Sequence, residues 1–162
     1  MTGAIAIRQA NKDDLPRLKK IIDLSFPLFF RYFAAHSVSD LEEPTLVFQV
    51  NGEIVAFAKQ TQFCIKQVKY GCLLWIAVDP EFRRQGTALA LTNAALDWQK
   101  INGASVIFAS VQRSNKASLG ALEKAGFVRT GFRSLRCLFG WRVFQFLIDI
   151  WFAPGELVLA HF

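Results

Sequence analysis

The sequence contains few of the residues that cross-link small domains or bind metal ions. Its 162 residues include three cysteines, Cys64, Cys72 and Cys137, an odd number with no CxxC spacing among them. His36 and His161 are the only histidines, so the ligand clusters of zinc sites are missing and we expect no bound metal. Reduced, unpaired thiols are typical of the cytoplasm, where we expect the protein to reside.

Long apolar runs and targeting segments are also missing. The most apolar stretch, residues 138–152, is interrupted by Arg142, Gln145 and Asp149, whereas a membrane-spanning helix needs about 20 predominantly apolar residues. Residues 1–8 show no basic segment followed by an apolar run, which is the pattern of a signal peptide. We therefore expect no stable membrane insertion and no signal peptide.

Apolar residues are abundant, and charge is unevenly distributed. Hydrophobic residues make up 52% of the chain and charged residues 20%, which excludes intrinsic disorder. The length predicts a single domain over residues 1–162. Residues 83–142 hold ten basic and two acidic residues, a net charge of +8, within a chain of net charge +6. This basic region indicates an anionic partner, which could be a nucleic acid, a membrane surface or a phosphorylated cofactor.

Hydrophobic periodicity predicts the element order β-α-α-β-β-β-α-β-α-β-β, in one mixed sheet with helices on both faces. Asn51-Gly52 is typical of a hairpin turn, and a nearly all-apolar strand is expected at residues 72–78. The next helix is expected to begin at Gly86 or Thr87 and to end at Ile101. The last segment has two interpretations. Residues 144, 146, 148 and 150 alternate as in a strand, whereas residues 142, 145 and 149 share one side of a helix; we favour the strand because Gly140 would supply a hairpin turn.

The segment from Trp75 to Leu91 carries the clearest chemical signal. A buried strand ends, a short basic turn follows, and Gly86 stands where a long helix begins. The free N–H groups in the first turn of a helix, together with its dipole, form an anion site. Gly86 leaves room for a phosphate to approach the backbone, and Arg83 and Arg84 add positive charge. The pattern predicts a diphosphate cradle; the alternative is an ordinary strand–helix turn with solvated arginines.

This segment resembles the acetyl-CoA signature of the GNAT N-acetyltransferase superfamily, [RQ]-x-x-G-x-[GA], which Arg83-Arg84-Gln85-Gly86-Thr87-Ala88 matches. A second family block follows, from Asn115 and Ser118 to Gly126-Phe127, and the resemblance covers about residues 5–135. It implies a mostly antiparallel α/β sheet of about seven strands and acetyl-CoA as the acyl donor, with no metal.

The resemblance also implies how the cofactor is held. Residues Ile76, Ala77 and Val78 would offer backbone groups to the pantetheine, and one of their N–H groups would polarise the thioester carbonyl. The backbone from Arg84 to Ala88, including Gln85, Gly86 and Thr87, would bind the pyrophosphate, supported by the arginines. Asn115 and Ser118 would face the cofactor from the next crossover; the alternative for Asn115 is a simple helix N-cap.

Departures from the family pattern leave the catalytic residues unassigned. Leu122 stands where the family often has a tyrosine general acid, and Gly71-Cys72-Leu73 stand where many members carry a glutamate general base. We expect an N-acetyltransferase in which a primary amine attacks acetyl-CoA directly; the alternative is a CoA-binding sensor module with little or no catalysis. The acceptor, a small molecule or a peptide, would lie near residues 26–43 and the C-terminal hairpin. A homodimer is left open, and nucleic acid is not expected because the aromatic interleaving of nucleic-acid modules is missing.

Overall fold

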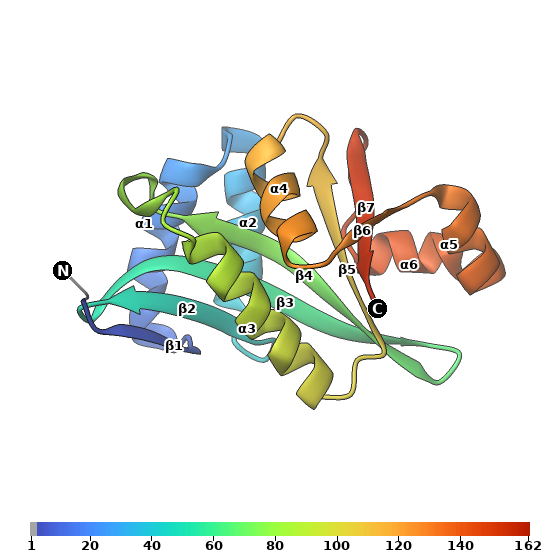
Figure 1. Ribbon diagram of the computed structural model, residues 1–162, viewed down its shortest axis with the longest axis horizontal. Coiled ribbons are helices and arrows are strands. Elements are labelled where there is room, and N and C mark those ends of the chain that lie inside the picture. Colours follow the sequence, from blue (N-terminus) through green and yellow to red (C-terminus); the bar gives the residue numbers. More distant parts are fainter. Residues whose placement is uncertain (1–2) are drawn as a thin grey trace. The chain divides into compact units, whose positions relative to one another are not determined.

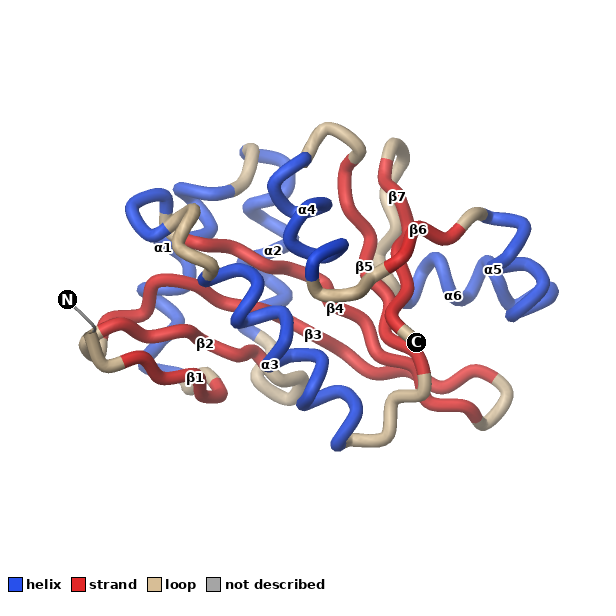
Figure 2. Tube along the Cα trace, in the orientation of Figure 1, coloured by secondary structure: helices blue, strands red, loops and turns tan. Residues whose placement is uncertain are grey.

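The computed structural model describes residues 3–162, which form a seven-stranded sheet and its helices (Figure 1, Figure 2). The strand order is β1-β2-β3-β4-β5-β7-β6. β4 and β5 are parallel, whereas β1–β2, β2–β3, β5–β7 and β6–β7 are antiparallel. The expected α/β fold with a mostly antiparallel sheet is confirmed. The strands are β1 (Ile5–Gln9), β2 (Thr45–Val50), β3 (Glu53–Ile65), β4 (Val68–Val78), β5 (Val106–Gln112), β6 (Val128–Thr130) and β7 (Glu156–His161).

The helices connect these strands in the order expected up to β6. They are α1 (Leu15–Ser25), α2 (Leu28–Ser39), α3 (Thr87–Ile101), α4 (Lys116–Lys124), α5 (Phe132–Phe139) and α6 (Val143–Asp149), with short 3-10 helices η1 (Lys12–Asp14), η2 (Pro80–Phe82) and η3 (Gly140–Arg142). None of the helices in residues 3–162 has the length and apolar character needed to cross a bilayer.

The chain divides into two compact units. The first contains the residues up to Gln60 together with 75–95, and the second contains residues 61–74 together with 96–162. β3, β4 and α3 each contribute residues to both units. That the whole chain forms a single domain stays a prediction.

In the first unit, helices α1 and α2 pack on one face of the strands, and α3 begins on the other (Figure 1). The apolar residues of α1 recur at the spacing of one helical face, with Leu18, Ile21 and Ile22 buried. Every residue of β3 from Ile54 to Gln60 is buried. Because neighbouring strand residues point to opposite faces, both faces of this strand are covered. The core combines Leu18, Ile21, Ile22, Ala34, Val38, Val47, Ile54, Phe57 and Ala77.

In the second unit, the expectation of a strand in the last segment is wrong. Residues 143–149 form α6, and the last strand is β7, further along the chain. Val143, Phe146 and Ile150 are buried, whereas Phe144 and Ile148 are 59% and 75% exposed. The buried residues therefore follow the spacing of a helix. The strand-like alternation of apolar residues was misleading because two of them, Phe144 and Ile148, lie outside the core. Instead of opening a hairpin, Gly140 ends α5 with a positive φ of 59°.

The beginning of β4 also differs from the expectation. The strand starts at Val68 rather than at Cys72, because the turn before it is only two residues long, Lys66 and Gln67. Both have positive φ angles, 51° and 64°, as required in a tight type I′ hairpin turn. The polar residues after this turn therefore belong to the strand.

Candidate active site

The end of β4 is fixed by a salt bridge in the first unit. The register of β4 with β5 runs from Tyr70↔Val106 to Leu73↔Ala109, and β4 continues beyond these pairs to Val78. Asp79 follows, and its carboxylate lies 2.9 Å from the guanidinium of Arg17, which also donates to the carbonyl of Ile54 at 2.8 Å. The side chain of Asp79 is 8% exposed. Arg17 thus anchors the turn that leaves β4.

The turn after η2 has the backbone geometry of an anion site. Arg84 and Gly86 have positive φ angles of 61° and 80°, and Gln85 between them does not. Such an alternation points successive N–H groups into one concavity. Thr87 begins α3, and the N–H of Ala90 donates to the carbonyl of Gly86 at 3.0 Å, so the N–H groups before Ala90 have no helical acceptor. A Cβ added to Gly86 would meet no atom of the described chain within 4 Å. Open space, free N–H groups and a helix N-terminus therefore coincide here.

The two arginines of this turn have different environments. The guanidinium of Arg83 donates to the carbonyl of Val78 at 3.0 Å and to the hydroxyl of Ser25 at 3.3 Å. It therefore holds the turn against the end of β4, a role that the sequence did not indicate. Arg84 is exposed, and its side chain makes no hydrogen bond or ion pair with residues 3–162. Arg84 is thus the arginine whose charge is available to a phosphate.

In the second unit, Asn115 is the N-cap of α4. Its side-chain oxygen accepts the N–H of Ser118 at 3.1 Å. This is the structural alternative considered from the sequence, and contact of either residue with a cofactor stays a prediction. Leu122, in the same helix, is 3% exposed. A buried leucine donates no proton, so this helix supplies no general acid at the family's usual position.

An aromatic cluster in the first unit surrounds Trp75 of β4. Its ring centroid lies 5.4 Å from that of Phe26 and 6.3 Å from that of Phe30. The indole Nε1 of Trp75 is buried and has no hydrogen-bond partner within residues 3–162. A buried N–H normally finds an acceptor, so this donor is suited to a ligand carbonyl. Sequence reasoning missed it because Trp75 fits the apolar pattern of a central strand.

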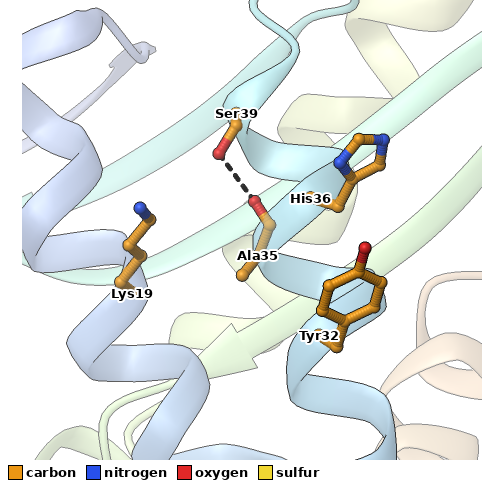
Figure 3. Close-up of a pocket in the computed structure, with 5 residues that line it drawn as sticks. All are labelled: Lys19, Tyr32, Ala35, His36 and Ser39. Carbon is orange, nitrogen blue, oxygen red and sulfur yellow. Dashed lines mark hydrogen bonds between the residues drawn. The ribbon is translucent and has the colours of Figure 1, made fainter.

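A small hollow lies between α1 and α2, with a volume of about 220 Å³ (Figure 3). Its lining is Lys19, Tyr32, Ala35, His36 and Ser39. The rings of Tyr32 and His36 are stacked, and the Ser39 hydroxyl donates to the carbonyl of Ala35 in its own helix. No carboxylate or thiol is among the lining residues, so the hollow supplies neither a glutamate base nor a cysteine nucleophile.

A carboxylate in the second unit lies next to the end of the paired part of β5. Ser110 follows Ala109, the last β5 residue in register with β4, and donates its hydroxyl to Glu156 Oε2 at 2.6 Å. The N–H of Ala153 donates to the same oxygen at 2.9 Å. Oε1 of Glu156 makes no hydrogen bond to any of the described residues. The sequence did not indicate this pair, because Glu156 lies on β7, beyond the misassigned last strand.

The comparisons with known proteins decide the family. Residues 6–127 match the model of the Acetyltransferase (GNAT) family. The chain belongs to this family. The match confirms the resemblance and the expected enzyme class, an acyltransferase. It covers the strand–turn–helix segment around Gly86 and ends before α5 and α6.

Two enzymes and one solved structure show how far the similarity to known proteins extends. The chain is 34% identical to the [ribosomal protein bS18]-alanine N-acetyltransferase of Escherichia coli K12 over 105 residues, 64% of this chain and 66% of that enzyme. The match thus spans slightly less than two thirds of that relative. An N-alpha-acetyltransferase of Sulfurisphaera tokodaii is 30% identical over 131 residues, 75% of this chain and 78% of that protein. The structure of the NatC complex bound to Gag peptide and CoA shares the fold, with a TM-score of 0.70, 20% identity and 96% of both chains covered.

Proposed function

We propose that this chain transfers the acetyl group of acetyl-CoA to the α-amino group of a protein N-terminus, in the cytoplasm. The observation that carries the proposal is the cradle at residues 84–88, where two positive φ angles, an open glycine and a helix N-terminus coincide. Its chemistry suits a pyrophosphate. Relatives named for acetylating an N-terminal alanine or N-alpha positions support the choice of acceptor.

The residues of the cradle would divide the work of cofactor binding. The N–H groups of Gln85, Gly86, Thr87 and Ala88 would donate to the pyrophosphate, and the charge of Arg84 would reinforce them. Arg83 would act indirectly, since it holds the turn through the carbonyl of Val78. The backbone of Ile76, Ala77 and Val78 would bind the pantetheine. Asn115 and Ser118 are kept as proposed cofactor contacts.

The missing family base favours an α-amine over a lysine as the acceptor. The attacking amine must be neutral, and α-amino groups have pKa values near 7.7–8.0, against about 10.4 for lysine. Near neutral pH the neutral fraction of an α-amine is therefore roughly 10²-fold larger. A positioned general base contributes about 10²–10⁴-fold. An α-amine acceptor thus compensates for part of the rate enhancement that a glutamate base in β4 would otherwise supply.

The attacking nitrogen must still lose a proton once the C–N bond forms and the C–S bond breaks. We propose that Glu156 accepts it, because Oε1 is unengaged while Oε2 is fixed by Ser110 and Ala153. The CoA thiolate leaves without a side-chain acid, which is feasible because free thiols have pKa values near 8.5. The indole N–H of Trp75 would donate to a carbonyl of the acceptor peptide.

Two peptides test the acceptor. One has a free N-terminus and no lysine; the other has a blocked N-terminus and one internal lysine. Mass spectrometry after incubation with acetyl-CoA should show acetylation of the first peptide alone.

A substitution in the cradle tests cofactor binding. Arg84→Ala should raise the KM for acetyl-CoA, with a smaller effect at high salt. Lys20→Ala, which removes an exposed charge from α1, is the matched control and should change nothing. Acetylation of the lysine peptide alone would refute the proposal, as would CoA binding without turnover.

A pH profile tests Glu156. Glu156→Gln keeps an oxygen that can accept from Ser110 and Ala153 but cannot take a proton, so we expect kcat to fall about 10²-fold with an unchanged melting temperature. The remaining activity should rise with pH in step with neutralisation of the amine. Ser110→Ala should reduce kcat less, because it removes one of the two contacts that orient the carboxylate and leaves the carboxylate itself in place. If Glu156→Gln kept the wild-type kcat at every pH, Glu156 would not be the proton acceptor.

A further inference from the structure

The connection between β6 and β7 is a helical excursion rather than a turn. β6 and β7 are antiparallel neighbours, paired from Val128↔Ala160 to Thr130↔Val158. Such neighbours can be joined by a few residues, yet residues 132–149 form α5, η3 and α6 between them, followed by a non-helical segment that begins with residues 150–152. Figure 1 shows α5 and α6 as adjacent helices in this connection. The family match ends at residue 127, so this segment lies outside it. We call residues 132–152 the helical insert.

The helical insert is apolar on its buried and on its exposed side. Its inner residues Leu135, Phe139, Val143, Phe146 and Ile150 belong to the core of the second unit. Trp141 is 84% exposed and Ile148 75%. The full set of large apolar side chains that the insert leaves exposed is Phe132, Leu138, Trp141, Phe144, Ile148, Trp151 and Phe152. An apolar concentration of this kind marks an interaction surface.

The exposed charges of the helical insert are all positive. Arg133, Arg136 and Arg142 are exposed, and the guanidinium of Arg136 lies 5.9 Å from the ring centre of Trp141. Asp149 is the only acidic residue of the insert; it is half-buried, and desolvation by burial raises its pKa. A hollow of about 550 Å³ is lined by Arg133, Ser134, Cys137 and Leu138, which places a cation and an aliphatic group together. The surface therefore suits an occupant that is anionic and apolar at once.

Three occupants can be compared on these grounds. A second copy docking the same surface around a twofold axis would bring the arginines of both copies together without carboxylates to neutralise them. A nucleic acid would engage the arginines but would leave Leu138, Phe144 and Ile148 without an apolar environment. An anionic lipid surface satisfies both, because lipid phosphates pair with arginine, tryptophan favours the interface, and phenylalanine and isoleucine enter the acyl boundary.

We propose that the helical insert docks this protein on anionic membrane surfaces as a peripheral protein. Docking leaves the chain outside the bilayer, in agreement with the lack of a spanning helix within residues 3–162. It also gives part of the basic region an anionic partner other than the cofactor. The inference concerns a surface outside residues 76–88 and stands independently of the proposed acceptor.

Vesicle co-sedimentation of the full chain tests the proposal. We expect binding to vesicles of equal parts phosphatidylglycerol and phosphatidylcholine, and little binding to phosphatidylcholine alone. Raising the salt to 1 M should weaken binding, because the screening length falls from about 10 Å at 0.1 M to about 3 Å. Trp141→Ser with Ile148→Ser should reduce binding by roughly tenfold or more. The three arginines changed together to glutamine should reduce it by about 10²-fold.

Matched controls distinguish docking through the helical insert from non-specific hydrophobic adsorption and from unfolding. Leu28→Ser with Phe29→Ser removes two apolar side chains that are 80% and 71% exposed on α2, and this variant should bind vesicles like the wild type. All variants should keep wild-type circular dichroism and acetyl-CoA binding. Equal binding to both kinds of vesicle, or none to either, would overturn the proposal. So would dimerisation abolished by the Trp141 and Ile148 changes, or RNA binding abolished by the arginine changes, since either would assign the surface to another occupant.

Discussion

Arg83, Arg84 and Gly86 are neighbours in the sequence, but at the residue scale their roles separate. Arg83 is bound to Val78 and Ser25, whereas Arg84 is exposed in a left-handed backbone conformation. Left-handed geometry disfavours side chains with a Cβ by roughly 1–2 kcal/mol. The turn therefore holds Arg84 in a strained backbone conformation and leaves its charge in solvent. Binding of an anion beside this charge would offset the strain.

Gly86→Val tests the cradle at the residue scale. The new side chain would occupy the space that the pyrophosphate backbone contacts need, so acetyl-CoA binding should fall at least 10²-fold by calorimetry. The left-handed φ also predicts a stability loss of about 1–2 kcal/mol. Gly52→Val is the matched control, because Gly52 has φ 84° and, like Gly86, no atom within 4 Å of an added Cβ. It should lose similar stability and bind acetyl-CoA normally. Equal binding by both variants would mean that the cradle lies elsewhere.

At the element scale, the segment from β4 to α3 could be predicted and the helical insert could not. Around Gly86, buried strand, basic turn and helix start each follow from local residue types, and the family signature agrees with them. In the insert, Phe144 and Ile148 are as apolar as the buried Phe146, so the hydrophobic pattern does not distinguish the core face. Only the packing of Val143, Phe146 and Ile150 within the second unit makes that distinction. Glu156 was missed for the same reason, since it follows this segment.

Two substitutions test the helical assignment of residues 143–149. In a strand, Phe146 and Ile148 would lie on one face and contribute alike. In α6, Phe146 is fully buried and Ile148 is 75% exposed. In urea unfolding, Phe146→Ala should lower the free energy of unfolding by about 3–5 kcal/mol. Ile148→Ala should change it by no more than about 0.5 kcal/mol. Similar losses of stability for both variants would support the strand assignment instead.

At the scale of the whole molecule, the basic residues of the segment 83–142 are divided between the two compact units. Arg83 and Arg84 belong to the turn before α3, in the first unit, whereas Arg133, Arg136 and Arg142 belong to the helical insert, in the second. Arg129, between them in the sequence, is paired with Glu123 at 2.9 Å. A net charge of +8 over sixty residues of sequence thus combines a proposed cofactor cradle, a surface ion pair and a proposed lipid contact. Charge counted along the sequence could not separate these.

The two compact units should unfold together, as expected for a single domain. β3, β4 and α3 each supply residues to both units, so melting one unit alone would break strands and a helix in their middle. Scanning calorimetry should show one transition with equal calorimetric and van't Hoff enthalpies. Acetyl-CoA at a hundredfold excess over its Kd should stabilise the chain by about 2.7 kcal/mol and raise the Tm by about 5–10 °C. Dephospho-CoA should raise it less, and the Gly86→Val variant should gain at most about 1–2 °C. Two transitions, with only one shifted by acetyl-CoA, would instead mean that the units are separate domains and that the cofactor is bound by one of them.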